Sequence, residues 1–226
     1  IVVDMDSGAV LYGQNIHVAH PPASITKILT ALVVLENCQL DEMVEFSETA
    51  VNSVESDSGN KLGSVAGDQL SVEDCLYGMM LVSSNQAANA LAEHVAGSIS
   101  GFVDLMNEKA AELGCEESHF DNPSGLNGDT QYVTAYDMAL ISRAAYSNET
   151  LLEISSTLSR KLGPTANYPG GITVENEHRL LNPNDEFYYS AAKAGKTGYL
   201  QAAGNTLVTY AEQDGRRLVS VILRGQ

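Results

Sequence analysis

A serine and a lysine three residues apart form the first pair of side chains whose types and spacing could do chemistry. They are the ends of Ser24-Ile25-Thr26-Lys27. On a helix, residues with this spacing lie one turn apart on the same face, so the hydroxyl and the amine are within reach of each other. Serine is a weak nucleophile, and a lysine can accept its proton only where burial or nearby positive charge lowers the lysine pKa. The pair predicts a serine nucleophile with a lysine base, if the helix is buried.

The segment that follows Ser24 predicts a buried helix. Pro21 and Pro22 end an extended stretch, and the apolar positions beyond are too dense for a narrow surface stripe. They are Ile28, Leu29, Ala31, Leu32, Val33 and Leu35. At the start of this helix the backbone N–H of Ser24 has no intrahelical acceptor, so it can point at a developing oxyanion.

The SxxK pattern occurs by chance about once in a chain of this length, so the pattern alone is weak evidence. Two other SxxK matches in this sequence are weaker candidates for a nucleophile and its base. Ser58 and Lys61 fall in the polar stretch 53–69, which carries several glycines and predicts a solvated surface loop. Ser190 and Lys193 precede a Gly-rich strand start. Only Ser24 begins a strongly apolar helix.

Ser83-Ser84-Asn85 is an SxN motif between the apolar segments 76–82 and 87–96, which predicts a loop joining two helices. One interpretation is an N-cap, in which a side chain here satisfies free helix N–H groups. The other is functional: Ser83 shuttles a proton, and Asn85 bonds a substrate amide or the base.

Lys196-Thr197-Gly198 is the sharper motif, because composition predicts such a tripeptide only about 0.05 times in this length. Gly198 would let a ligand backbone lie against the strand, while Lys196 and Thr197 offer a charge and a hydroxyl to a carboxylate. A phosphate-binding loop is excluded because it needs glycine at position 190, where this chain has Ser190.

The elements around these motifs predict an α+β fold. Strand-like segments 1–5 and 9–12, and again 202–210 and 217–223, flank turn signals and predict a hairpin at each end of the chain. Capping-box patterns begin helices at Ser71 and Thr134, and Gly114 should end a helix that runs from about Phe102. We expect the hairpins to pair into one antiparallel sheet with helices between them. No internal repeat or domain linker is evident.

Composition excludes several classes of protein. The 226 residues hold 29 Asp and Glu against 12 Lys and Arg, a net charge of −17 that disfavours nucleic acid as a partner. No apolar run reaches the roughly 18 residues needed to span a bilayer. Cys38, Cys75 and Cys115 have no CxxC spacing, and the five histidines are dispersed, so neither a disulfide framework nor a metal site is predicted.

SxxK, SxN and KTG in this order resemble the signature of penicillin-binding proteins and class A β-lactamases. The flanking sequence resembles more narrowly the low-molecular-mass penicillin-binding proteins that are serine-type D-alanyl-D-alanine carboxypeptidases. The segments that carry this resemblance are 22–32, Asn122-Pro123-Ser124-Gly125-Leu126, 134–139 and Lys196-Thr197-Gly198-Tyr199 followed by Ala203-Gly204. It extends from Val3 almost to the end of the chain.

The resemblance implies a peptidase that trims the terminal D-alanine from peptidoglycan stem peptides through an acyl-enzyme on Ser24, the serine that β-lactams would also acylate. No cofactor is implied. By the same resemblance Lys27 is the general base, Ser83 and Asn85 line the cleft, and Lys196 and Thr197 bind the terminal carboxylate, with Gly198 beside them. The backbone N–H groups of Ser24 and Tyr199 would form the oxyanion hole.

The implied fold is β-lactamase/transpeptidase-like: a five-stranded antiparallel sheet flanked by helices, with an inserted helical lobe. We expect a single catalytic domain over 1–226, with the sheet from about 1–20 and 190–226 and the lobe from about 24–180. Both ends look cut, so a leader upstream, and a C-terminal β domain with a membrane anchor downstream, are expected outside this chain. The implied location is extracytoplasmic, with no membrane contact from this piece.

Two departures from the family pattern stand out. Ser84 occupies the middle of SxN, where glycine is frequent, and an arginine beyond the KTG hairpin has no counterpart, since Arg224 does not align with it. A class A β-lactamase is the nearest alternative, but it needs an ExxLN motif, and the look-alike Glu177 to Asn182 has one residue too many. A catalytically idle wall-binding homologue would show a broken motif, and none is broken.

Overall fold

Strands from the two ends of the chain form one antiparallel sheet in the computed structural model, which describes residues 1–54, 59–126 and 128–225. The strand order is β2-β1-β9-β8-β7. The strands are β1 (Val2–Asp4), β2 (Val10–Tyr12), β7 (Ala192–Leu200), β8 (Gly204–Gln213) and β9 (Arg216–Gly225). Val2 pairs with Ser220, which joins the two hairpins. The predicted α+β class with a five-stranded antiparallel sheet is confirmed.

The helices occupy the middle of the chain. They are α1 (Lys27–Asn37), α2 (Glu48–Asn52), α3 (Val72–Leu81), α4 (Asn85–Ala96), α5 (Ile99–Glu112), α6 (Ala135–Ser147) and α7 (Glu149–Ser156). Two 3₁₀ turns are η1 (Ala23–Thr26) and η2 (Arg179–Leu181). Two small sheets pair β3 (Met43–Glu45) with β4 (Gln69–Ser71), and β5 (Ser159–Lys161) with β6 (Thr173–Glu175).

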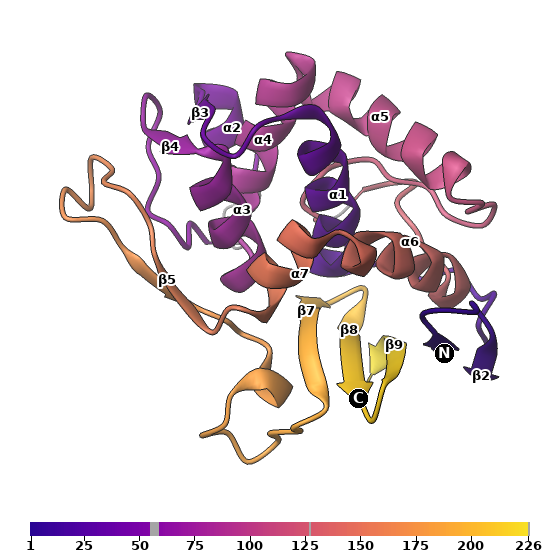
Figure 1. Ribbon diagram of the computed structural model, residues 1–226. Coiled ribbons are helices and arrows are strands. Elements are labelled where there is room, and N and C mark those ends of the chain that lie inside the picture. The colour runs from indigo at the N-terminus through magenta and orange to yellow at the C-terminus, as the bar shows by residue number, and fades with distance from the viewer. Residues whose placement is uncertain (55–58, 127, 226) are drawn as a thin grey trace.

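Helices α6 and α7 lie between the sheet and α1 (Figure 1). Helix α6 packs on β9 and α7 on β7, while α1 contacts α3, α4, α5, α6 and α7. Every residue of α1 from Lys27 to Val34 is buried, as the dense apolar pattern predicts. This central helix gives the residues at its N-terminus a rigid, water-poor base. No helix in the described part of the chain is long and apolar enough to cross a membrane.

Helices α3 and α6 begin at the capping residues that the sequence predicts. Ser71 Oγ accepts from the N–H of Asp74, and Thr134 Oγ1 accepts from the N–H of Asp137, as the capping patterns predict. Gly114 follows α5 with φ +83°, the left-handed conformation that ends a helix. The start of α5 was placed too late: it begins at Ile99, because Ser98 caps it by accepting from Gly101 N.

The stretch 59–69 differs from the solvated loop that its polar composition predicts. Leu62, Ser64 and Asp68 are buried, although their neighbours are mostly exposed. The Asp68 carboxylate accepts from the N–H groups of Val65 and Ala166, which ties the loop to a segment about a hundred residues away. Carboxylate bonds to backbone N–H groups are compatible with burial, and composition does not reveal them. Ser58 lies outside the described residues.

Candidate active site

Ser24 lies in the 3₁₀ turn η1, one turn before α1, rather than on the α-helix that the sequence predicts. The preceding Ala23 has φ +53°, a strained conformation for a residue with a side chain. Gly125 explains how this backbone is held. It has φ +83°, and a Cβ there would lie 1.9 Å from the Ala23 carbonyl oxygen, so the 122–126 loop packs directly against the turn that presents Ser24.

Lys27 is fully buried beneath Ser24, with a relative exposure of 0%. Its Nζ lies 3.0 Å from Ser24 Oγ, 2.7 Å from Asn85 Oδ1 and 2.5 Å from the Ser124 carbonyl oxygen. The carbonyl is fixed by Asn122, whose Oδ1 accepts from Ser124 Oγ and Gly125 N. The amine is therefore held in one position by partners from three separate segments.

The surroundings of Lys27 favour the neutral amine. Burial lowers its pKa well below the ordinary value, and the positive charge of Lys196 lowers it further. A neutral amine has two hydrogens and one lone pair. The Asn85 and Ser124 oxygens accept the two hydrogens, because neither can donate at that atom, which leaves the lone pair directed at the Ser24 hydroxyl.

The SxN segment combines the two interpretations that its sequence left open. Ser84 caps α4 by accepting from Ala87 N, while Asn85 faces Lys27. Ser83 adopts φ +62° and lines the cleft, and its buried Oγ has no hydrogen-bond partner among the described residues. The cap thus anchors the loop, and its neighbours on either side point at the cleft.

Lys196 and Thr197 lie on β7 in different environments. Lys196 is 2% exposed, and its Nζ donates to the Thr197 carbonyl at 3.0 Å. Burial lowers its pKa to about 8. Thr197 is half-buried and lines the cleft, whereas Lys196 lies beneath the surface. Thr197 can touch a ligand directly, and Lys196 acts through its charge.

Gly198 marks the closest approach between β7 and η1. A Cβ at this position would lie 2.8 Å from the Ser24 nitrogen and 2.4 Å from Thr206 Oγ1. Thr206 in turn donates to the Pro22 carbonyl at 2.9 Å. Only glycine leaves room for the strand here, so the backbone N–H groups of Ser24 and the following Tyr199 are near each other. The Tyr199 side chain is 67% exposed at the rim.

A cleft of about 1220 Å³ joins these residues. Its lining includes Ser24, Ser83, Asn85, Thr197, Gly198 and Tyr199, with Lys27 and Lys196 buried below it. All eight candidate residues named from the sequence therefore belong to one place. The other complete SxxK does not: Lys193 is exposed, and its Nζ bonds the Ser190 carbonyl.

Sequence reasoning assigned no role to several residues at this site. Ser124 and Gly125 were noted only as part of a family segment, although they position Lys27 and Ser24. Lys61 was interpreted as a solvated loop residue, but it lines the cleft, 2.6 Å from Glu177. His178 is buried against β7 and lines the cleft, and its Nε2 lies 3.2 Å from the Val208 carbonyl. The sequence holds no spacing signal for Lys61 or His178.

A serine above a buried lysine, facing a KTG strand across a cleft of an α+β fold, defines the class of penicillin-recognising serine enzymes. Comparison with known sequences narrows this class. The sequence model of the D-alanyl-D-alanine carboxypeptidase family matches residues 1–226, and the chain belongs to this family. The predicted family and enzyme class are thus confirmed.

Relatives and solved structures agree with this assignment. The chain is 39% identical to D-alanyl-D-alanine carboxypeptidase DacB2 of Mycobacterium tuberculosis, over all of this chain and 74% of that protein. It is 31% identical to DacF of Bacillus subtilis, over 98% of this chain and 56% of the relative. A crystal structure of the D-alanyl-D-alanine carboxypeptidase from M. tuberculosis H37Rv superposes with a TM-score of 0.89, at 38% identity, covering 100% and 81% of the two chains.

The fold is also shared with an enzyme of different name. A variant of the Streptomyces K15 DD-transpeptidase superposes with a TM-score of 0.88, at 29% identity, over 99% of this chain and 88% of that one. The predicted β-lactamase/transpeptidase-like fold is confirmed.

Proposed function

We propose that this protein removes the terminal D-alanine from peptidoglycan stem peptides that end in D-Ala-D-Ala, through an acyl-enzyme on Ser24. The observation that carries the proposal is the buried Lys27 amine, 3.0 Å from the Ser24 hydroxyl, with both of its other partners fixed oxygens. A neutral amine so placed can accept a proton from serine at neutral pH. Family membership supports the same activity over the two alternatives.

Substrate binding starts with the terminal carboxylate. The Thr197 hydroxyl in the cleft donates to this carboxylate, and the buried Lys196 ammonium, bonded to the Thr197 carbonyl, supplies the positive field. Lys196 is therefore a positioning residue and an electrostatic one, and direct contact is assigned to Thr197. The expectation from the sequence is that both side chains bind the carboxylate, and the proposal assigns the direct contact to Thr197.

Acylation follows from this geometry. Ser24 Oγ attacks the carbonyl carbon of the penultimate D-alanine, and its proton passes to Lys27 Nζ. The negative charge on the carbonyl oxygen is stabilised by the N–H groups of Ser24 and Tyr199, which the glycine at position 198 brings close together. The C–N bond then breaks, and a Ser24 ester remains.

The leaving amine needs a proton, which Lys27 can return through Ser83. Ser83 lines the cleft, and its buried hydroxyl has no hydrogen-bond partner among the described residues, so it is free to take up the proton from Lys27 and to donate its own to the amine. Water then attacks the ester, again with Lys27 as the base, and releases the shortened peptide. Each residue in this cycle is supplied by the chain.

Because peptidoglycan lies outside the cytoplasmic membrane, the proposed substrate implies an enzyme that is secreted or attached to the outer face of that membrane. The proposal includes attachment through an anchor in the full-length protein. β-Lactams are expected to acylate Ser24, because their strained amide presents a carbonyl and a carboxylate to the same groups.

Two assays test the proposal. The purified protein should release D-alanine from a diacylated Lys-D-Ala-D-Ala peptide, and mass spectrometry should find a long-lived penicillin adduct on Ser24. Ser24→Ala should abolish both, whereas Ser190→Ala, which changes the exposed SxxK serine, should leave both intact. Equal D-alanine release by Ser24→Ala would remove the nucleophile assignment, and rapid penicillin turnover without an adduct would favour a β-lactamase.

A further inference from the structure

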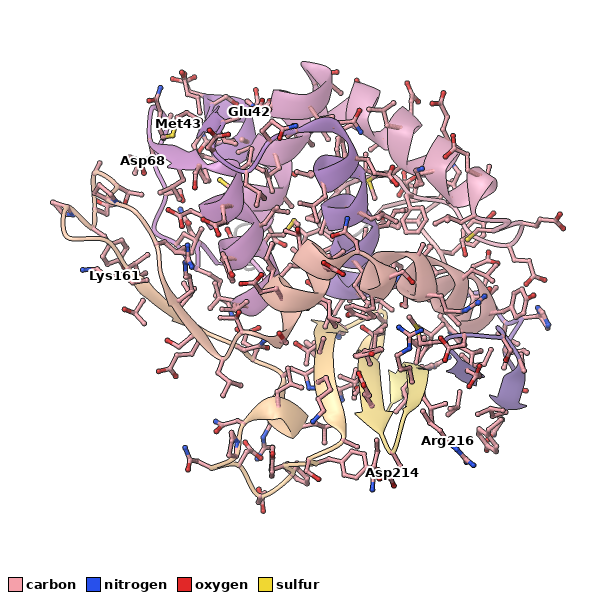
Figure 2. The ribbon with its side chains drawn as sticks, viewed as in Figure 1. Glu42, Met43, Asp68, Lys161, Asp214 and Arg216 are labelled. Atoms are coloured by element: carbon pink, nitrogen blue, oxygen red, sulfur yellow. The ribbon has the colours of Figure 1, made fainter. Side chains whose placement is uncertain are left out.

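A thiol, a carboxylate and an imidazole meet at the opposite end of α1 from Ser24. Cys38 follows the last residue of α1, Glu42 lies in the connection to β3, and His94 is in the last turn of α4. Their ligand atoms, Sγ, a carboxylate oxygen and a ring nitrogen, all lie within 4.8 Å of one another. Figure 2 shows Glu42 at the far side of the helical lobe from the five-stranded sheet. The cluster is separate from the cleft.

The three groups are held in place by backbone and side-chain bonds. The Cys38 N–H donates to the Val34 carbonyl at 3.0 Å, which fixes it to the end of α1. The Glu42 backbone carbonyl accepts from Val72 N at 2.8 Å, and Glu42 Oε1 accepts from Gln39 N at 2.6 Å. Its Oε2 is directed at His94 Nε2, 2.9 Å away. The bond from Gln39 to Oε1 thus holds the Glu42 carboxylate so that its Oε2 points at His94.

We propose that Cys38, Glu42 and His94 form a zinc-binding site. Thiolate sulfur, imidazole nitrogen and carboxylate oxygen are the three ligand types that proteins offer to zinc. In a tetrahedral site the bond lengths of about 2.0 to 2.3 Å place ligand atoms roughly 3.3 to 3.7 Å apart, so small side-chain rotations suffice from the present separations. A thiolate and a carboxylate balance the two positive charges of zinc, and the fourth position is left for water or an anion.

A simple His–Glu ion pair does not account for the third group. The chain contains such a pair elsewhere: His17 Nδ1 lies 2.7 Å from Glu117 Oε2, and no cysteine among the described residues forms a three-ligand cluster with it. At the His94–Glu42 pair, by contrast, the free thiol of Cys38, at the end of α1, lies within 4.8 Å of both the imidazole and the carboxylate. His94 has a side-chain exposure of 23% and Glu42 of 43%, so a hydrated ion can reach both.

The site would connect the end of α1 to α4. These helices already pack together, and α4 begins at Asn85, which bonds Lys27 at the other end of α1. Zinc would therefore cross-link α1 and α4, whose opposite ends begin with Lys27 and Asn85. Its expected effect is on stability rather than on the chemical step.

Cobalt(II) binding tests the site directly, because sulfur coordination gives a charge-transfer band in the near ultraviolet. The reduced protein should bind one Co²⁺ with this band, and one equivalent of Zn²⁺ should remove the band by competition. Cys38→Ser should abolish the band, and His94→Gln should weaken binding at least about tenfold. Cys115→Ser and His17→Gln are matched controls, which should leave the band and the affinity unchanged.

Thermal unfolding gives a second measurement that does not depend on the cobalt spectrum. Zn²⁺ should raise the Tm of the wild-type protein and of both controls, but not of Cys38→Ser. Penicillin acylation should be the same in all these variants, because the cluster lies away from Ser24. Absence of the sulfur band in wild type, its survival in Cys38→Ser, or an equal zinc effect on the Tm of Cys38→Ser would each overturn the proposal.

Discussion

Lys27 and Lys196 are two buried amines that the proposed mechanism requires in opposite charge states. Lys27 must be neutral to accept the Ser24 proton, and burial together with the Lys196 charge moves its pKa in that direction. Lys196 must stay charged to attract a carboxylate, and its pKa of about 8 leaves it mostly protonated at pH 7. Lys27 thus depends on Lys196, because the charge on Lys196 helps to keep Lys27 neutral.

This coupling predicts a bell-shaped pH dependence of penicillin acylation. As pH falls, Lys27 takes up a proton and the rate declines; as pH rises through about 8, Lys196 loses its charge and the rate declines again. Lys196→Gln should remove the alkaline limb and move the acid limb to higher pH, since the pKa of Lys27 rises. The measurement is the second-order acylation rate between pH 5 and pH 10.

Lys193→Gln is the matched control for that experiment. Lys193 lies on the same strand, but it is exposed and bonds only the Ser190 carbonyl among the described residues. Its replacement should leave both limbs where they are. An acid limb at the same pH in wild type and Lys196→Gln would show that Lys196 does not set the charge of Lys27.

His178 packs against the KTG strand at the cleft. Its ring is 2% exposed, and its Nε2 lies 3.1 Å from Thr209 Oγ1 as well as near the Val208 carbonyl of β8. A Cβ on Gly195 would come within 2.4 Å of the same nitrogen, so the ring packs directly on β7. Burial lowers the pKa of His178 to about 4, against the hydrogen bond to Val208, which raises it.

Acid should therefore destabilise the protein through His178. The unfolded chain takes up a proton at about pH 6.5, while the folded protein resists it down to about pH 4, so stability falls as pH decreases between these values. The effect is on the order of 3 kcal/mol at its limit. Urea unfolding from pH 7 to pH 4 measures it: His178→Asn should flatten the slope, and His17→Asn, at an exposed histidine, should not.

At the scale of elements, the oxyanion region depends on how closely β7 approaches η1. Gly198→Ala would insert a methyl group 2.4 Å from Thr206 Oγ1, which is held by its bond to the Pro22 carbonyl, and 2.8 Å from the Ser24 nitrogen. We expect an acylation rate at least about 100-fold lower, because displacements near 1 Å cost this much in catalysis. Gly170→Ala, with no atom within 4 Å of the new Cβ and no positive φ, is the control.

The lower acylation rate of Gly198→Ala should reflect altered geometry at Ser24 rather than partial unfolding of the protein. The Tm of Gly198→Ala, measured with that of Gly170→Ala, separates the two effects. A normal acylation rate in Gly198→Ala would mean that the contact between β7 and η1 does not set the geometry of the oxyanion region.

Elements with a local signal could be predicted from the sequence. The apolar density after Ser24 predicted the buried α1, and the Ser71 and Thr134 caps predicted the starts of α3 and α6. Turn residues predicted both hairpins. The 3₁₀ turn at Ser24 could not be predicted, because it is stabilised by Gly125, about a hundred residues away. The burial of Leu62 and Asp68 likewise depends on distant partners.

The site shows the same division between local and long-range information. Three motifs predicted residues that the structure brings together at one cleft, because their residue types and spacing indicate a specific chemistry. Other residues take part in the site through contacts that no motif in a single sequence indicates. These contacts are the Ser124 carbonyl, the ion pair of Lys61 and the packing of His178. The burial of Lys196 could not be predicted from the sequence either, and the proposed electrostatic role of that residue depends on it.

At the scale of the whole molecule, the fold brings both ends of the chain to one sheet and suspends the helical middle above it (Figure 1). The reactive serine comes from the N-terminal part, the SxN loop from the middle and the KTG strand from the C-terminal part. The cleft exists only where these parts meet. A fragment that lacks β7 to β9 would thus lose the proposed carboxylate site together with three of the five strands of the main sheet.

Net charge gives the whole molecule a further measurable property. The chain carries −17, whereas the charged residues at the cleft, Lys61, Glu177 and Arg179 with Lys196 below, are positive on balance. At about 0.01 M salt the screening length is about 30 Å, so an approaching anion is repelled by the entire surface; at 0.15 M it is about 8 Å, and the cleft dominates. The acylation rate of an anionic β-lactam should therefore rise severalfold over this range, while that of a zwitterionic β-lactam changes little. Stopped-flow acylation measures both, and a rate for the anionic drug that falls with salt would show that the cleft cations already dominate at long range.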